Sequence, residues 1–308
     1  SAEKTGHGSG NLIATLVGES ASPTIYFTCH MDTVAPGNGI KPMIDGDYIK
    51  SDGTTILGSD DKAGLAALLE GIRVLKEQNI AHGTVQFLIT VGEEAGLFGA
   101  RNIDRSLIKA EYGYALDSTG KVGEIVTSAP SQVEILATIH GKAAHAGVNP
   151  EEGVSAIQVA SRAISKMSLG RIDKETTANI GKFQGGTASN VVPEKVEIVA
   201  EARSRSDEKL NMQVEKMVQA FELAAEEMGA KSEVKTEVIY PSFFFDESEK
   251  VVQKAVSAIR KIGRDPYIDA SGGGSDANIF AGYGLPTANL GLGYEKIHTT
   301  SERMPITE

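Results

Sequence analysis

The chain has 308 residues, of which 41% are hydrophobic, and its formal net charge is −11. This length predicts two domains, and the acidic balance, without any basic cluster, argues against nucleic acid as a partner. No apolar run reaches the roughly eighteen residues of a membrane span. The single cysteine, Cys29, excludes an internal disulfide and fits a cytoplasmic location.

The first part of the chain alternates strand-like and helix-like segments. Strands are expected at 11–17, 24–28, 85–91 and 112–116, and the first two are expected to pair. Between the second and the third strand we expect a loop or hairpin over 38–53 and a helix over 63–77, whose apolar residues recur at helical spacing. This βαβ series predicts an α/β fold with a mostly parallel, mixed sheet flanked by helices.

Histidine and carboxylate residues stand where these segments end or begin. They are His30, Asp32, Asp60, Asp61, Glu93, Glu94 and Asp117. Ligands of open α/β sheets bind outside the carboxyl ends of the strands, so these side chains are expected to meet there. Each of them alone could be a solvated surface residue, but independent surface acids are not expected at the same end of every element.

Two of these motifs predict chemistry directly. Two neighbouring glutamates repel each other unless a cation separates their tasks, which favours one of Glu93 and Glu94 as a metal ligand and the other as a general base. Asp32 follows His30 by two residues and could accept a hydrogen bond from its ring. That is the carboxylate–histidine–metal arrangement, which fixes the imidazole tautomer.

The pattern changes after Asp117. Strands are expected at 132–141, 176–184, 191–204 and 232–240, and helices at 153–167 and 207–228, the second with Asp207 at its N-cap. The order β-α-β-β-α-β is ferredoxin-like, so we expect an inserted α+β domain at 122–240. The first domain would then comprise 1–121 and 241–308, with a helix over 249–262 and strands near 266–269 and 287–291.

Together these motifs resemble the aminoacylase and carboxypeptidase G family of co-catalytic zinc metallopeptidases, and within it the peptidase T-like branch of tripeptide aminopeptidases. The resemblance covers nearly the whole chain, and it rests on His30-x-Asp32, Gly58-Ser59-Asp60-Asp61-Lys62, Glu93-Glu94, Asp117 and His298. It implies five metal ligands: His30, Asp60, Glu94, Asp117 and His298.

The resemblance also implies a role for each of these residues. Asp60 would bridge two ions, with His30 and Asp117 completing one site, and Glu94 and His298 the other. Asp32 would orient His30, and Glu93 would be the general base, in keeping with the divergence of neighbouring side chains. The peptide bond between Asp60 and Asp61 is expected to be cis.

The expected cofactor is a pair of divalent metal ions per chain. Imidazole and carboxylate ligands suit zinc, and cobalt or manganese could occupy such a site as well. Paired ions lie about 3.5–4 Å apart and lower the pKa of a shared water.

The expected inserted domain carries three further matches to this family. The segment 141–147 contains His145, the segment 185–193 contains Asn190, and Arg203 follows. By resemblance these three residues bind substrate, and the domain acts as a lid or dimerisation domain. In relatives that dimerise through it, the histidine enters the partner's active site, so a homodimer is a further expectation.

The expected function is hydrolysis of amide bonds by a dinuclear zinc enzyme, an aminopeptidase acting on short peptides such as tripeptides. A deacylase of N-acylated amino acids would use the same metals and remains an alternative. A nucleotide-binding enzyme is disfavoured because no Gly-x-Gly-x-x-Gly follows strand 24–28. A non-catalytic metal-binding protein is disfavoured because it would not need Glu93.

Overall fold

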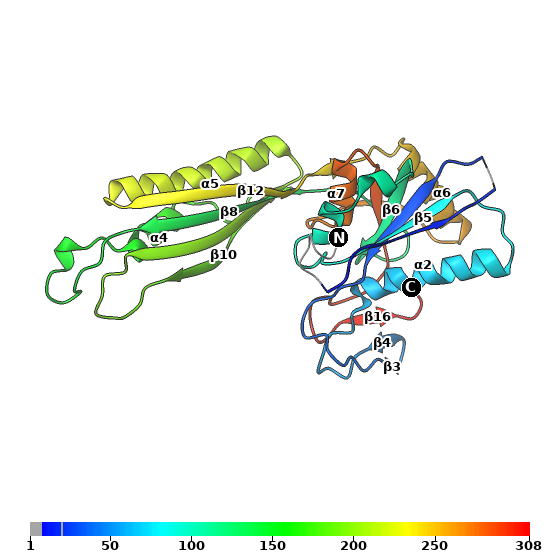
Figure 1. The fold of residues 1–308 in the computed structure, drawn as a ribbon, viewed down its shortest axis with the longest axis horizontal. Helices are drawn as coiled ribbons and strands as arrows, with labels where there is room; N and C mark the ends of the chain where they lie inside the picture. The colour runs from blue at the N-terminus through cyan, green and yellow to red at the C-terminus, as the bar shows by residue number, and fades with distance from the viewer. Residues whose placement is uncertain (1–7, 20) are drawn as a thin grey trace. The chain divides into compact units, whose positions relative to one another are not determined.

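The computed structural model describes residues 8–19 and 21–308, which form two compact units (Figure 1). One unit runs to Ala129 and resumes at Phe243, and the other comprises Pro130–Ser242. Within the described residues, none of the helices has both the length and the hydropathy needed to cross a membrane.

The first unit is built on an eight-stranded sheet. Its strands lie in the order β1 (Leu12–Leu16), β5 (Val85–Thr90), β2 (Ile25–His30), β6 (Tyr112–Ser118), β15 (Thr287–Gly291), β7 (Glu124–Ala129) and β13 (Phe243–Phe244), with β14 (Tyr267–Ala270) also paired to β7. The neighbours β5, β2, β6 and β15 run parallel, whereas β1 and β13 are antiparallel to their partners. The expected mostly parallel, mixed sheet is therefore confirmed.

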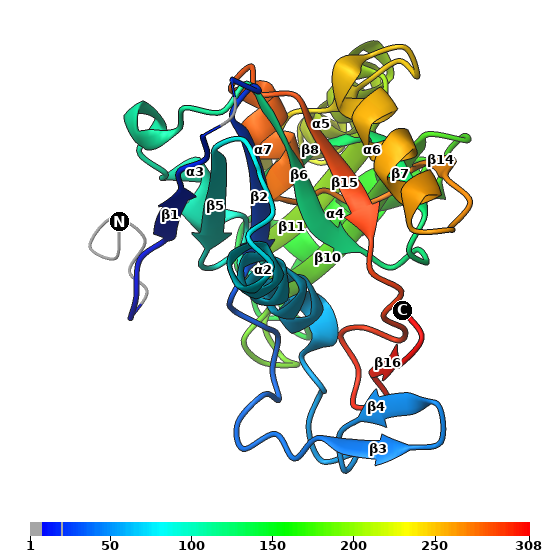
Figure 2. The ribbon, with the colours of Figure 1, turned by 90° about the vertical axis from the view of Figure 1, so that its right-hand side faces the viewer.

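Helices cover both faces of this sheet (Figure 2). They are α2 (Ser59–Glu77) and α6 (Lys250–Lys261) on one face, and α3 (Phe98–Arg101) and α7 (Asp276–Gly282) on the other, with a short 3-10 turn η1 (Arg105–Leu107). Cys29 in β2 packs with Leu68 of α2, whereas the ring of Tyr26 meets Phe280 of α7 at 5.4 Å. Their odd and even positions on one strand explain the opposite faces.

A small sheet lies beside α2 in the first unit. It consists of β16 (Arg303–Pro305), β4 (Tyr48–Lys50) and β3 (Met43–Asp45), all antiparallel. This sheet joins the hairpin expected over 38–53 to the last residues of the chain.

Two expectations about the large sheet were wrong. β1 pairs with β5 and not with β2, because the crossover through α2 places β5 directly beside β2 and leaves β1 at the edge. β7 falls inside the range 122–240 that we expected for the inserted domain, but it pairs with β13, β14 and β15 of the first unit.

The second unit has the expected ferredoxin-like order. Its sheet runs β12 (Lys231–Tyr240), β8 (Ser131–His140), β11 (Lys195–Ser204), β10 (Thr176–Gly185) and β9 (Gly170–Arg171), and it packs against α4 (Ala156–Ser165) and α5 (Asp207–Glu227), with η2 (Pro150–Glu152) before α4. Ser206, and not Asp207, caps α5, because its hydroxyl accepts the N–H of Lys209. β12 and β9 form the two edges of this sheet.

Candidate metal centre

Three parallel strands bring the predicted residues together. β2 pairs with β5 in a register that places His30 beside Thr90, and β6 flanks β2 on its other side. His30, the pair Glu93 and Glu94, and Asp117 therefore share the carboxyl edge of the sheet. α2 begins at this edge, and its second residue, Asp60, contacts His30.

The buried ring of His30 lies among carboxylates. Its Nε2 is 3.0 Å from Oδ1 of Asp60 and 3.8 Å from Oδ1 of Asp117. Its Nδ1 donates to the main-chain carbonyl of Asp32 at 3.1 Å, which leaves Nε2 as the atom available to a metal. Burial alone would lower the pKa of His30, but Asp32, Asp60 and Asp117 raise it well above its ordinary value.

The carboxylate of Asp32 does not accept the ring hydrogen bond that we expected. Its Oδ1 is 3.6 Å from Nδ1 of His30, beyond hydrogen-bonding distance. Its two oxygens instead accept the main-chain N–H groups of Glu93 at 3.1 Å and Glu94 at 3.2 Å. Although burial opposes it, His30 and these two N–H groups lower the pKa of Asp32 to about 2. Asp32 thus links the histidine to the glutamate loop.

A second histidine approaches Asp60 from the opposite side. Nε2 of His298 is 3.3 Å from Oδ2 of Asp60 and 3.0 Å from Oε1 of Glu94. Oε1 of Glu94 is buried and makes no hydrogen bond with any described residue, despite this short distance. His298 has a φ of 60°, in the left-handed region that residues other than glycine seldom adopt. Such conformations cluster at functional sites.

The two aspartates at the start of α2 have different surroundings. Both have non-helical backbone angles, and the peptide bond between them is cis, as expected. Asp61 accepts the N–H of His30 at 3.1 Å and that of Gly64 at 3.2 Å, one on each oxygen. One imidazole nitrogen or carboxylate oxygen from each of His30, Asp60 and Glu94 lies within 4.8 Å of the others. The same holds for His30, Asp61 and Asp117.

Burial also acts on the remaining acids. It raises the pKa of Glu93 well above its usual range, and the nearby Asp117 and Asp276 add to this effect. Burial raises the pKa of Asp117 to about 7 against the opposing effect of His30. Because so many carboxylates repel one another here, the donor set fits divalent cations, which would offset their charge.

Sequence reasoning missed three residues that support this centre. The hydroxyl of Tyr294 donates to Oδ1 of Asp117 at 2.9 Å, and Asp276 accepts a hydrogen bond of 2.5 Å from Thr90. Glu302 is buried and accepts hydrogen bonds at the start of α2. They lie far in sequence from the groups that they contact, and only the folded chain brings them to the site.

In the second unit, two of the three predicted substrate-binding residues lie together. His145 forms an isolated bridge with Val191, and the main-chain carbonyl of Asn190 accepts the N–H of Ala146 at 2.9 Å. Both side chains belong to exposed residues. These loops follow the end of the sheet at which His140 pairs with Lys195.

Arg203 lies at the opposite end of the same sheet. It is opposite Gln132, close to where the chain enters the unit, and its guanidinium donates to Oε2 of Glu201 at 2.9 Å. The ten-residue strand β11 separates it from the other two residues, which corresponds to roughly 30 Å at about 3.3 Å per residue. Within one chain, one small substrate cannot contact all three.

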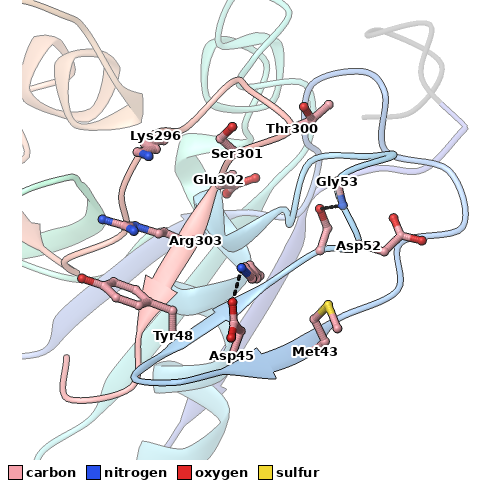
Figure 3. A pocket seen from close by; sticks show the side chains of 12 residues that line it. Met43, Asp45, Tyr48, Asp52, Gly53, Lys296, Thr300, Ser301, Glu302 and Arg303 are labelled. Carbon is pink, nitrogen blue, oxygen red and sulfur yellow. Dashed lines mark hydrogen bonds and ion pairs between the residues drawn. The ribbon is translucent and has the colours of Figure 1, made fainter.

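The first unit also contains a pocket of about 450 Å³ beside β16 (Figure 3). Its wall includes Tyr48, Lys50, Lys296, Glu302 and Arg303. Two of its cations are already paired, Lys50 with Asp45 and Arg303 with Glu295. The lining contains three acidic and three basic residues, so its charges balance, and Glu302 connects it to the start of α2.

Comparisons with known proteins agree with this geometry. The family model described as peptidase family M28 matches residues 11–163, and that described as peptidase dimerisation domain matches residues 131–229. The crystal structure of aminopeptidase PepT from Bacillus cereus is 61% identical, with a TM-score of 0.91, and the match covers 99% of this chain and 82% of that one.

Two further relatives are similar over the same extent. A tripeptidase structure from Staphylococcus aureus is 50% identical with a TM-score of 0.95, and the match covers 99% of this chain and 82% of that one. The protein YqjE of Bacillus subtilis is 62% identical over 304 residues, which are 99% of this chain and 82% of the relative.

Proposed function

Because this chain belongs to the peptidase T family of metallopeptidases, we propose that it is an aminopeptidase that releases the N-terminal residue of tripeptides at a centre of two zinc ions. The observation that carries this proposal is the placement of Asp60. Its Oδ1 lies 3.0 Å from Nε2 of His30, and its Oδ2 lies 3.3 Å from Nε2 of His298. A carboxylate between two such imidazoles has the arrangement of a bridge between two cations.

We assign one ligand set to each ion, with Asp60 common to both. His30 and Asp117 complete the first set, and Glu94 and His298 the second, in keeping with the short distances around each histidine. Asp61 lies near the first set, but both its oxygens already accept main-chain N–H groups. We therefore assign it to holding the loop in place.

Two bound divalent ions would supply a water of lowered pKa and polarise the scissile carbonyl. We assign Glu93 to moving the proton, since among the described residues its side chain forms no hydrogen bond or ion pair with a proposed ligand and its main chain is fixed by Asp32. It would take the proton from the attacking water and give it to the leaving amine. Burial raises the pKa of Glu93, which strengthens its carboxylate as the acceptor of the water's proton.

Zinc is the metal we propose, because two imidazoles and three carboxylates are ligands that zinc commonly takes. Cobalt and manganese share these preferences closely enough to occupy the same centre. Titration of the metal-free protein with each ion measures its affinity, and a kinetic assay of each loaded form shows which ion supports turnover.

His145, Asn190 and Arg203 are proposed to bind substrate. A histidine and an asparagine side chain can donate to the oxygen of the scissile carbonyl, and an arginine suits the peptide's carboxylate. Since Arg203 lies at the far end of β11 from the other two, the three could meet around one substrate only if two chains contribute. We therefore propose a homodimer in which the second unit forms the contact, consistent with the match to a peptidase dimerisation domain.

The test of the proposed activity is a screen of dipeptides, tripeptides and N-acylated amino acids with zinc-loaded and cobalt-loaded protein. We expect release of the N-terminal residue from tripeptides, and no cleavage of the same tripeptides once their amino group is acetylated. Deacylation of acylated amino acids, without release of residues from free peptides, would contradict the proposal and support the deacylase alternative.

A further inference from the structure

The carboxylate of Glu302 joins two parts of the proposed metal centre. Glu302 is buried, with 1% of its surface exposed. Oε2 accepts the N–H of Gly58 at 2.7 Å, and Oε1 accepts the hydroxyl of Ser59 at 2.6 Å and the N–H of Asp60 at 3.0 Å. Three successive residues at the start of α2 thus donate to one side chain.

The start of α2 needs such support because its own hydrogen bonding is incomplete. Asp60 and Asp61 have non-helical backbone angles, and Gly58 before them is left-handed, without a side-chain cap. The N–H groups of a first helical turn have no partners within the helix. Glu302 satisfies two of these main-chain donors and interacts favourably with the positive end of the helix.

Glu302 is also fixed to the loop that carries His298. Its N–H donates to the carbonyl of Thr299 at 3.1 Å. Main-chain hydrogen bonds between Glu295 and Arg303, at 2.9 Å and 3.0 Å, close this loop at its base. Figure 3 shows Glu302 between Ser301 and Arg303 on this loop. The same carboxylate therefore fixes the loop of His298 relative to the main chain of Asp60.

We infer that Glu302 is a positioning residue that holds Asp60 between His30 and His298. The inference rests on the proposed metal centre, and it adds a residue outside the proposed ligand set. Replacing residues that orient metal ligands commonly weakens metal binding by about 10–100-fold. Because Asp60 serves both ions, both should be affected.

The variant Glu302→Gln keeps the shape of the side chain but replaces one acceptor oxygen with an NH2 group. Either the N–H of Gly58 or that of Asp60 then loses its acceptor in a buried place. Titration of metal-free protein with zinc should show both ions bound about 10–100-fold more weakly than in wild type. In cobalt-loaded protein, the visible absorption of both ions should change.

Glu295→Gln is the matched control. Glu295 precedes His298 by three residues, but its carboxylate pairs with Arg303 and not with the start of α2. We expect wild-type affinity for both ions in this variant. The thermal unfolding of metal-free Glu302→Gln is measured alongside, so that weak binding by an intact fold is separated from loss of the fold.

Unchanged affinity for both ions in Glu302→Gln would overturn the inference, and so would the loss of one ion alone, since that would indicate an effect on the His298 loop without Asp60. If the variant does not fold, Ser59→Ala decides the question, because it removes one of the three hydrogen bonds. Ser59→Ala should lower the affinity for both ions to a smaller extent than Glu302→Gln. An affinity equal to that of wild type would overturn the inference. Failure of wild type itself to bind two ions would instead count against the proposed centre.

Discussion

Neighbouring acids with different contacts are the main feature of this site at the residue scale. Asp61 accepts two main-chain N–H groups, whereas Asp60 faces two histidines. Oε1 of Glu94 lies 3.0 Å from Nε2 of His298, whereas Asp117 and Asp276 are the charges that add most to the effect of burial on the pKa of Glu93. Adjacent side chains diverge, so each pair can give one ligand and one residue with another task.

The glutamate pair offers the first test of this division. Glu93→Gln should retain both metal ions and lose activity by about 10²–10⁴-fold or more, since it removes the general base. Glu94→Gln should instead reduce the metal content, because it removes a ligand. Metal analysis of the purified variants and kinetics on a tripeptide measure both effects. Equal loss of metal in the two variants would show the division of roles to be wrong.

The proposed ligand Asp117 predicts a pH dependence of metal binding. Burial, partly opposed by His30, raises the pKa of Asp117 to about 7 in the metal-free protein. Below that pH the carboxyl holds a proton that the metal must displace, and above it the carboxylate is free. Zinc affinity should therefore rise as the pH increases through about 7, and the raised pKa of the ligand His30 extends this rise to higher pH. A calorimetric pH series measures this, and affinity that falls with rising pH would contradict it.

At the element scale, much of the site could be predicted because strand ends are readable in sequence. Apolar runs ending at His30 and Asp117, and one that ends just before Gly92 and Glu93, predicted where β2, β6 and β5 stop, and parallel pairing then placed these residues together. Side-chain hydrogen bonds could not be predicted in this way. The Asp32 carboxylate accepts the N–H groups of the glutamate loop and not the His30 ring, and Glu302 reaches α2 only through the fold.

Pairing of β1 was misjudged for a similar reason. Strands that are neighbours in sequence often pair, but the crossover through α2 places β5 beside β2. Such competition between a short connection and a crossover depends on the whole sheet. The cap of α5 at Ser206 is only one residue from the expected position, within the ordinary uncertainty of helix ends.

Close packing of α2 against β6 gives a prediction at this scale. A Cβ added at Gly64 would meet Oδ1 of Asp61 and lie 2.7 Å from the carbonyl of Leu116. Gly64→Ala should therefore destabilise the protein by about 1–3 kcal/mol, the usual cost of overpacking. Because Asp61 holds the main chain of His30, metal affinity should fall as well. Denaturant unfolding and zinc titration measure the two effects.

Gly71→Ala is the matched control in the same helix. A Cβ at Gly71 would meet no atom within 4 Å, so this change should stabilise the helix by roughly 0.5–1 kcal/mol and leave zinc binding unchanged. If the two variants behave alike, the close approach of α2 to β6 does not position the site.

At the scale of the whole molecule, the length of the inserted sheet matters most. His145 and Asn190 follow one end of β11, and Arg203 lies at the other end. If all three contact substrate, the active site requires a partner chain. The isologous contact of a two-fold dimer would complete two such sites at once.

Complementation tests this arrangement. A His145→Ala chain and a Glu93→Gln chain should each be inactive, and a mixture of the two should recover activity. In a statistical mixture about half the dimers would be mixed, and each would hold one site with both groups intact. The activity of the mixture is measured after subunit exchange has been demonstrated. No recovery would place His145 in the site of its own chain or outside catalysis.

The most direct test of the account is anomalous diffraction at the zinc edge from a crystal of the zinc-loaded protein. We predict two peaks about 3.5–4 Å apart, one on each side of the Asp60 carboxylate. His30 and Asp117 should contact the first peak, and Glu94 and His298 the second. A single peak in metal-saturated crystals, or two peaks without Asp60 between them, would contradict the account.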